Sequence, residues 1–141
     1  MITTTGEYAL RAAAYLAQHP AGSTTSAIIA EATKVPHGYL QKVLKQLVRA
    51  GLIASQRGLN GGFVLARPAA EISILDVLRA VDAAPQRITR CPLGLAGHVR
   101  LCPVHRLVDD ATAAIEAAFA KASLADMSAT AGGVKALCEA K

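Results

Sequence analysis

The sequence predicts a mainly α-helical fold: a winged helix–turn–helix with a two-stranded wing and a long C-terminal dimerisation helix. Two short segments with helical apolar spacing are joined by a tight turn within SAIIAEATKVPHGYLQKVLKQLVRAG. A glycine-tipped pair of strand-like segments, LIASQRGLNGGFVLA, follows them directly. Near the C-terminus, apolar residues step by three and four positions along one long helix, which is the spacing of a helix–helix seam.

The boundaries of the first three helices follow from their capping residues. The first helix is expected over Thr4–Gln18, before the sequence HPAGS. The second begins near Thr24 or Thr25, either of which can cap its free amides, and it stops before Pro36. The third starts at Pro36, a favoured first-turn residue, and runs to Gly51, which suits the position after the helix end. Four apolar residues should form the buried face of this third helix: Leu40, Val43, Leu44 and Leu47.

The remaining elements follow in order along the chain. Strands are expected over residues 52–55 and 63–66, joined by the turn QRGLNGG, whose residues tolerate positive φ. Ser73 and Asp76 form a capping-box pattern that opens the helix SILDVLRAVD. A loop rich in proline and glycine comes next, and the last long helix begins near Pro103. The apolar side of that helix comprises Val108, Ala111, Ile115, Ala118 and Ala122.

These elements divide the chain into four parts. Residues 1–82 form the winged helix–turn–helix unit, 83–102 a cysteine-containing sensor loop, 103–127 the dimerisation helix, and 128–141 a flexible tail. Aromatic residues are only 4% of the chain, so a core completed by a second copy, in a homodimer, is expected. The turn position that Lys34 occupies, between the second and third helices, often takes glycine or asparagine, so lysine there costs some strain.

Composition also bounds the function. The net charge of +5 and the pI of about 9.4 suit a polyanionic partner. The first residues, MITTTGEYALRAAAYLA, lack the basic start of a secretion signal, and no apolar run reaches the ~18 residues of a membrane span. We therefore expect a cytoplasmic protein without a membrane partner. Its three cysteines are then expected to be thiols or ligands rather than a disulfide framework.

A helix–turn–helix places its second helix in the major groove of double-stranded DNA. In the second helix of the predicted motif, Gln41 can pair with a base edge, and Lys42 and Lys45 can neutralise phosphates. Arg57, at the tip of the wing, is placed to reach a narrow minor groove. The alternatives are a solvated charged face and a DNA-packaging role without sequence preference. The outward residues expected to contact DNA on the recognition helix are His37, Gln41, Lys42, Lys45 and Arg49.

The stretch CPLGLAGHVRLCPVH holds two cysteines and two histidines, including Cys91, Cys102 and His105. Iron clusters take thiolates first, and imidazole can replace a thiolate. Cys102 directly precedes a helix start, where free amides favour a thiolate, which would also suit redox sensing. His105 is one helical turn from Cys102 and so on the same side. Other interpretations are a Cys91–Cys102 thiol–disulfide switch, packing without sensing, and a thiol enzyme that uses Cys102 as nucleophile and His105 as base.

Three stretches resemble the Rrf-two family of bacterial transcription regulators: EYALRAAAYLA, IIAEATKVPHGYLQKVLKQLVRAGLIASQRGLNGGFVLARP and ISILDVLRAVD. The resemblance covers residues 1 to about 127. It implies a dimeric winged-helix protein with a long crossing helix, in which Arg57 enters the minor groove. Some members carry glutamate at the position of Gln41, so glutamine implies a different operator preference. A dimer with one such unit per chain predicts a palindromic operator.

The resemblance also implies ligands for an iron–sulfur cluster. Cluster-binding members carry three cysteines in this loop, of which Cys91 and Cys102 match the first and last, while Gly97 occupies the middle position. His105 matches a histidine that is a ligand in some members, and Glu7 matches an acidic residue that reaches the cluster from the partner subunit. Two thiolates, one imidazole and one carboxylate would complete a two-iron cluster. The departure at Gly97 leaves the thiol–disulfide switch open as the alternative, and Glu7 has its own alternative partner four residues on, Arg11.

Overall fold

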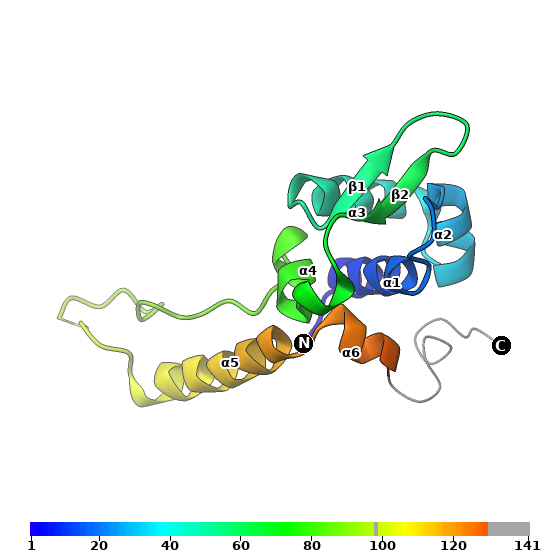
Figure 1. Ribbon diagram of the computed structural model, residues 1–141. Helices are drawn as coiled ribbons and strands as arrows, with labels where there is room; N and C mark the ends of the chain where they lie inside the picture. Colours follow the sequence, from blue (N-terminus) through cyan, green and yellow to red (C-terminus); the bar gives the residue numbers. More distant parts are fainter. Residues whose placement is uncertain (98, 130–141) are drawn as a thin grey trace.

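The computed structural model describes residues 1–97 and 99–129, and within them it shows helices around a small two-stranded antiparallel sheet (Figure 1). The winged helix–turn–helix arrangement predicted from the sequence is confirmed. The elements in chain order are α1 (Thr4–Gln18), α2 (Ser26–Thr33), α3 (His37–Arg49), β1 (Ile53–Gln56), β2 (Gly62–Leu65), the 3-10 turn η1 (Ala69–Glu71), α4 (Ile74–Ala80), α5 (Pro103–Lys121) and α6 (Leu124–Ala129).

Side-chain caps fix the starts of the first two helices. The hydroxyl of Thr3 accepts a hydrogen bond from the Gly6 amide at 3.1 Å, and α1 spans the residues expected. Thr25, rather than Thr24, caps α2, because its hydroxyl accepts from the Ile28 amide at 3.4 Å. Each cap satisfies an amide that has no partner inside the helix.

The turn between α2 and α3 is tight and strained. Lys34 adopts the left-handed conformation with φ of 57°, as expected for a position that favours glycine. Pro36 is the N-cap of α3 instead of its first residue, so the helix begins one position later than expected. Beyond the helix end, Gly51 has φ of 73° and its amide donates to the Val48 carbonyl at 2.9 Å, which confirms its predicted terminating role.

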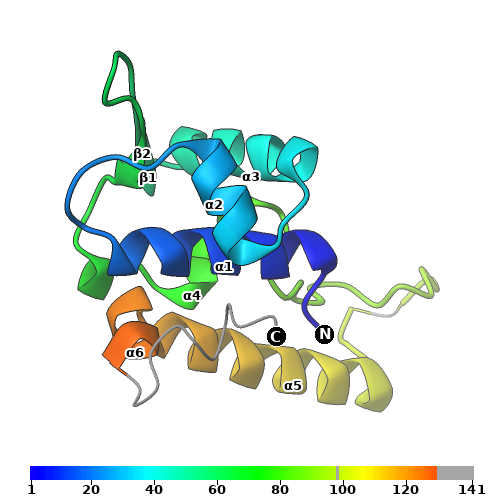
Figure 2. The ribbon, with the colours of Figure 1, turned by 90° about the vertical axis from the view of Figure 1, so that its right-hand side faces the viewer.

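The core lies around α1. Figure 2 shows α1 between α2 and α3 on one side and α4 and α6 on the other, and all four helices contact it. Ala9, Ala12 and Ala13 are buried on α1, so their small side chains let the neighbouring helices approach closely. The four predicted apolar residues of α3 are all buried: Leu40, Val43, Leu44 and Leu47.

The wing is a β1–β2 hairpin that projects from the helices (Figure 1). Its register pairs Ile53 with Leu65 and Gln56 with Gly62, so each strand is displaced by one residue from the expected range. The connection between α1 and α2 adds a further pair of bonds to the hairpin. The Thr24 amide donates to the Phe63 carbonyl at 2.9 Å, and the Phe63 amide donates to the Thr24 carbonyl at 2.8 Å. These bonds tie the base of the wing to the helical core.

The predicted capping box is present at the start of α4. Ser73 and Asp76 exchange two hydrogen bonds of 3.0 Å between side chain and backbone. Burial raises the pKa of Asp76, but the hydrogen bonds from Ser73, together with Arg67 and Arg79, outweigh it and hold this pKa below its usual value. The ionised carboxylate therefore suits the positive end of the helix dipole.

The segment expected to form one helix over residues 103–127 forms two. α5 ends at Lys121, and α6 begins at Leu124. The break follows from backbone pairing with the residues at the start of α4: the Ile74 amide donates to the Ala122 carbonyl, and the Leu124 amide donates to the Ile72 carbonyl, both at 2.9 Å. Residues 128 and 129 of the expected tail belong to α6, while residues 130–141, including Cys138, lie outside the described part of the chain.

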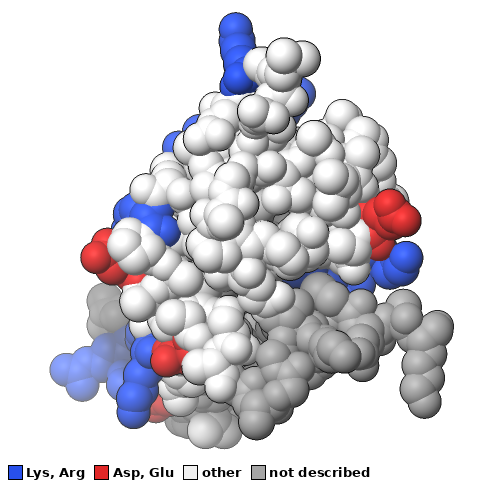
Figure 3. Space-filling model, turned by 45° about the vertical axis from the view of Figure 1, so that its right-hand side comes forward, with Lys and Arg blue, Asp and Glu red and all other residues white. Residues whose placement is uncertain are grey.

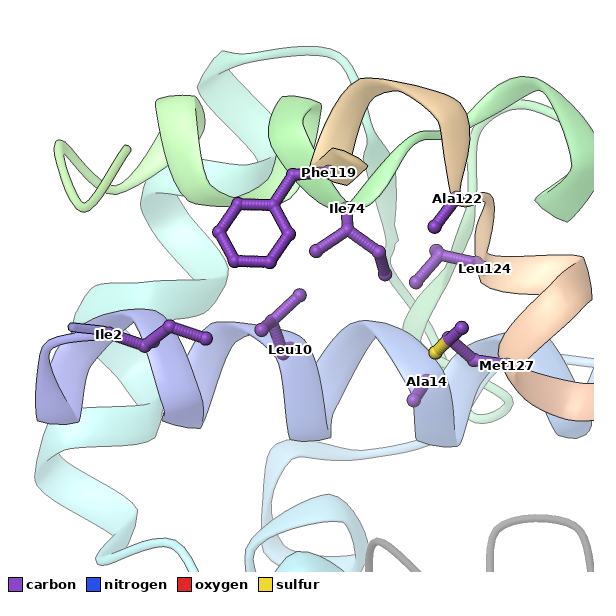
Figure 4. A pocket seen from close by; sticks show the side chains of 8 residues that line it. All are labelled: Ile2, Leu10, Ala14, Ile74, Phe119, Ala122, Leu124 and Met127. Carbon is purple, nitrogen blue, oxygen red and sulfur yellow. The ribbon is translucent and has the colours of Figure 1, made fainter. Parts of the chain in front are cut away.

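α5 lies along the opposite end of the molecule from the wing (Figures 1 and 2). No residue of Pro103–Lys121 is buried, and three of its apolar side chains are 46–71% exposed: Val104, Leu107 and Val108. An apolar cavity of about 290 Å³ opens where α1, α4, α5 and α6 meet, and Figure 4 shows Phe119, Leu10 and Met127 among the side chains that line it. In the described residues, no helix is long and apolar enough to cross a membrane.

Candidate functional site

The outer face of α3 carries every side chain expected to contact DNA from this helix. Leu40, Val43, Leu44 and Leu47 anchor the opposite face in the core, so helical periodicity turns the polar residues toward solvent. This orientation follows from the strong amphipathicity of the segment. All five outward residues are exposed: His37, Gln41, Lys42, Lys45 and Arg49.

An aromatic residue that was not among the predicted DNA contacts also lies on this face. Tyr39 is 56% exposed and meets the Tyr8 ring edge-on, with 6.1 Å between ring centroids. The Lys42 ammonium lies 5.7 Å from the centre of the Tyr39 ring, within the range of a cation–π contact. The apolar spacing of α3 could have identified Tyr39 as a surface residue, because it falls outside the buried positions of the helix. At the start of α3, the His37 imidazole Nε2 lies 3.0 Å from the Ser26 hydroxyl of α2.

Arg57 is exposed in the turn of the hairpin, directly after β1. The turn is permitted by Gly58, whose φ of 107° a larger residue rarely adopts. Figure 3 shows Lys and Arg side chains at the hairpin end of the molecule, and no acidic side chain at that end in this view. Residues 34–67, which include the recognition helix and the wing, contain no aspartate or glutamate, so every charged side chain of this segment is a cation or a histidine.

Three of the four predicted ligands converge in the second candidate site. The sulfur atoms of Cys91 and Cys102 and an imidazole nitrogen of His105 all lie within 4.8 Å of one another. His105 Nδ1 is 3.2 Å from the Cys102 sulfur and 3.6 Å from the Cys91 sulfur. Neither thiol is in a disulfide. Two soft sulfur donors and an imidazole facing one point are a donor set suited to iron or zinc.

Local structure explains this convergence. Cys102 is the N-cap of α5, and the first turn of the helix brings His105 onto the same side, as the spacing predicted. Cys91 comes from the loop, where it is only 9% exposed although each of residues 92–97 is exposed. Gly97, at the missing cysteine position, has φ of 89°, and a methyl group added there would have nothing within 4 Å. The site therefore combines Cys102 and His105 from the start of α5 with Cys91, a buried residue of the loop.

Glu7 is not part of this group within a single chain. It is exposed on α1 and forms an ion pair with Arg11, the alternative partner four residues on. A second nitrogen of the Arg11 guanidinium donates to the Thr33 carbonyl at the end of α2, at 3.4 Å. The expected contribution of Glu7 across a dimer remains a prediction. His98, the other histidine of the stretch, lies outside the described residues.

An ion-pair contact that the sequence did not reveal attaches the loop to α5. Arg87 donates to both carboxylate oxygens of Asp109 at 2.7 Å, and the Ile88 amide donates to the same carboxylate at 2.9 Å. These hydrogen bonds, Arg87 first, lower the pKa of Asp109 to about 2. Further along α5, Glu116 accepts from Arg79 of α4 at 2.5 Å. No local pattern could pair Arg87 with Asp109, because 22 residues separate them.

The fold is a winged helix that carries a cysteine–histidine group at the start of a long helix, none of whose residues is fully buried. The chain belongs to the Rrf2 family, described as iron-dependent transcriptional regulators, which it matches over residues 2–130. The family predicted from the sequence is thereby confirmed, and the protein is a transcription regulator of that family.

Solved structures agree with this assignment. IscR from T. potens is 27% identical, with a TM-score of 0.75, and the match covers 90% of this chain and 85% of that one. CymR from B. subtilis, the global cysteine regulator, is 27% identical with a TM-score of 0.74 over 89% of this chain and 94% of that one. CymR from Staphylococcus aureus in its oxidised form is 28% identical with a TM-score of 0.71, over 89% of this chain and 94% of the other.

Proposed function

We propose that this protein is a cytoplasmic, homodimeric, sequence-specific transcription regulator whose affinity for DNA is set by an iron–sulfur cluster in the sensor loop. The observation that carries the proposal is the convergence of Cys91, Cys102 and His105 within 4.8 Å. A metal-dependent regulator needs ligand atoms that meet at one point and a surface that reads DNA, and this chain offers both. Binding and regulation, without substrate turnover, are the roles that the family supports.

The donor set fits a cluster with one ligand still to be supplied. Cys91 and Cys102 would provide thiolates, and His105 would provide Nδ1, because that nitrogen faces both sulfur atoms. Glu7 of a second copy is the proposed fourth ligand, which would give two ligands to each iron of a two-iron cluster. When bound, the cluster would supply a group whose charge and ligand bonds change with oxidation or nitric oxide. A carboxylate is the hardest and most exchangeable of the four ligands.

Glu7 and Arg11 connect that ligand position to the DNA-binding unit. Arg11 binds Glu7 and also the last carbonyl of α2, so it joins α1 to the end of the helix that precedes the recognition helix. A Glu7 that engages the partner's site would give up or share its ion pair with Arg11. Release of Glu7 from the partner's site would restore its ion pair with Arg11. The position of α2, and with it α3, is therefore sensitive to where the Glu7 carboxylate is held.

The homodimer is supported by α5. This helix presents Val104, Leu107 and Val108 to solvent, and none of its residues is buried in the single chain. A second copy packing along α5 would remove these side chains from water. Two recognition helices related by a twofold axis would then read half-sites about one DNA turn apart, ~34 Å, or a multiple of it, in a palindromic operator.

A thiol–disulfide switch is the second candidate. Cys91 and Cys102 are free thiols whose sulfur atoms lie within 4.8 Å, so oxidation could join them with a small movement of the loop. One of the similar structures, CymR from Staphylococcus aureus, is of an oxidised form. The same two cysteines are indispensable in either case, but only the cluster requires iron and His105.

One preparation separates the two candidates. Protein purified without oxygen should be coloured and contain iron and sulfide, and Cys91→Ser or Cys102→Ser should remove both the colour and any redox dependence of DNA binding. Cys138→Ser is the matched control and should change neither. A colourless, iron-free protein would refute the cluster. DNA affinity that still responds to a thiol oxidant through Cys91 and Cys102 would then support the switch.

Dimerisation is tested on the apolar surface of α5. Leu107 is 71% exposed, so Leu107→Glu should leave the fold of each chain intact while it places a charge in the proposed interface. Sedimentation should show a dimer for the original protein and a monomer for the variant. Arg106→Glu, a charge change on an exposed neighbouring residue, is the control. A monomeric original protein that binds a palindrome with full affinity would contradict the proposal.

A further inference from the structure

We propose that Asp109 is a positioning residue for the sensor site: by binding Arg87 and Ile88 it holds the loop against α5 so that Cys91 faces Cys102 and His105. The inference rests on the proposed function of this site, but it concerns the arrangement of the thiols before any cluster is bound. Asp109 does not belong to the group of potential ligands and acts only through the loop.

The contact is stronger than an ordinary surface ion pair. Asp109 Oδ1 accepts from both Arg87 Nε, at 2.7 Å, and the Ile88 amide, at 2.9 Å, while Oδ2 accepts from Arg87 Nη2 at 2.7 Å. The carboxylate is 13% exposed and the guanidinium 45%. Two parallel hydrogen bonds from Arg87 fix the orientation of the guanidinium as well as its distance from the carboxylate. The bond from the Ile88 amide also fixes the backbone of the loop.

The position of Asp109 on α5 determines how the loop is aligned along this helix. Asp109 lies one helical turn after His105, so both side chains leave the same face of α5. Along the loop, Cys91 follows Ile88 by three residues. The loop therefore runs back along α5, bound at Asp109 through Ile88 and reaching His105 at Cys91. Two adjacent turns of one helix thus hold the two ends of a short stretch of chain.

Burial of Cys91 shows the effect of this attachment. The cysteine is 9% exposed, although residues 92–97, which follow it, are all exposed. The apolar residues that follow Cys91, such as Leu93 and Leu95, are themselves 56–62% exposed, so they do not pack together to bury it. The hydrogen bonds at Asp109 supply the missing constraint. Without them, Cys91 would sample more positions, and its effective concentration beside Cys102 would fall.

The test measures that effective concentration in the protein without iron. In a Cys138→Ser background, the protein equilibrates with reduced and oxidised glutathione: the two thiols lose two electrons and two protons to form one disulfide, and one oxidised glutathione becomes two reduced molecules. Asp109→Ala should lower the equilibrium constant for the Cys91–Cys102 disulfide about fivefold, the scale of a well-formed ion pair with one backbone bond. Arg87→Ala removes the two guanidinium bonds but leaves the Ile88 amide bond to Asp109, so it should lower the constant in the same direction by a smaller factor.

Two controls separate positioning from general destabilisation. Asp110→Ala removes the same charge from the next residue of α5, which is exposed. Arg79→Ala removes the hydrogen-bonded ion pair with Glu116, whose other carboxylate oxygen lies 4.0 Å from Arg87, and leaves the bonds to Asp109 in place. Both should keep the disulfide constant within about twofold of the original protein, even where thermal unfolding shows some loss of stability.

Equal disulfide constants for Asp109→Ala, Arg87→Ala and Asp110→Ala would overturn the inference. Iron and sulfide are counted in parallel on the original protein. If it binds no cluster while the Asp109 variant still shifts the thiol equilibrium, the proposed cofactor is wrong and the positioning role stands. If the original protein binds a cluster but the Asp109 variant does not shift the thiol equilibrium, the positioning role is wrong and the proposed cofactor stands.

Discussion

Replacement of Gly62 by alanine tests how the wing is held in place. Gly62 is the first residue of β2 and has φ of 147°. A methyl group there would lie 2.5 Å from the Thr24 carbonyl oxygen and 2.6 Å from the Thr24 carbonyl carbon. Both atoms belong to the backbone, so neither can move aside by a side-chain rotation.

The expected cost follows from the bonds that must break. Relief of the clash separates Thr24 from β2 and breaks their two hydrogen bonds, of 2.8 and 2.9 Å. At about 1 kcal/mol each, this loss adds to a backbone strain of about 1 to 2 kcal/mol, so Gly62→Ala should lower the free energy of unfolding by roughly 3 to 4 kcal/mol. Gly58→Ala is the matched control, because Gly58 also has positive φ, of 107°, but nothing lies within 4 Å of the added methyl group. That variant should lose only the strain, about 1 to 2 kcal/mol.

Urea unfolding of both variants measures the stability difference, and DNA binding measures its consequence. In the original protein, Arg57→Ala should weaken DNA binding, because the wing presents this arginine. In the Gly62→Ala background, Arg57→Ala should have little further effect on DNA affinity, because the wing is no longer held in the orientation that presents Arg57 to DNA. Equal destabilisation by Gly62→Ala and Gly58→Ala would show that the bonds to Thr24 do not fix the wing, and the reasoning would fail.

Two further predictions concern the recognition helix and acid stability. Lys45→Ala should weaken binding to specific and random DNA alike and reduce the salt slope by about one unit, whereas Gln41→Ala should relax base preference at one position of each half-site. Identical behaviour of the two variants on both kinds of DNA would contradict the placement of α3 in the major groove. The pKa of Asp109 falls from 3.8 to about 2 on folding, so its contribution to stability is present above pH 3.8 and is lost as the pH falls toward 2. The stability difference between the original protein and Asp109→Asn, measured by urea unfolding, should therefore narrow over that interval, and a constant difference would argue against the ion pair.

Much of the fold was determined by local sequence patterns. The boundaries of α1, the capping box at Ser73, the glycine after α3 and the start of α5 all depend on residues within one or two helical turns, and all four predictions are confirmed. The buried face of α3 follows from spacing alone, because a helix that carries apolar residues every three or four positions must turn that face inward. The pairing of Cys102 with His105 has the same local origin.

Tertiary structure decided the features that join distant parts of the chain. The break between α5 and α6 results from backbone bonds to residues 72–74, and the hold on the wing results from Thr24, neither of which leaves a pattern in the nearby sequence. The meeting of Cys91 with His105 likewise depends on the contact between Arg87 and Asp109. Hydrogen bonds and ion pairs across more than about twenty residues are fixed by how the helices pack, since any exposed arginine and aspartate would satisfy the same chemistry, and only the folded chain selects which two meet.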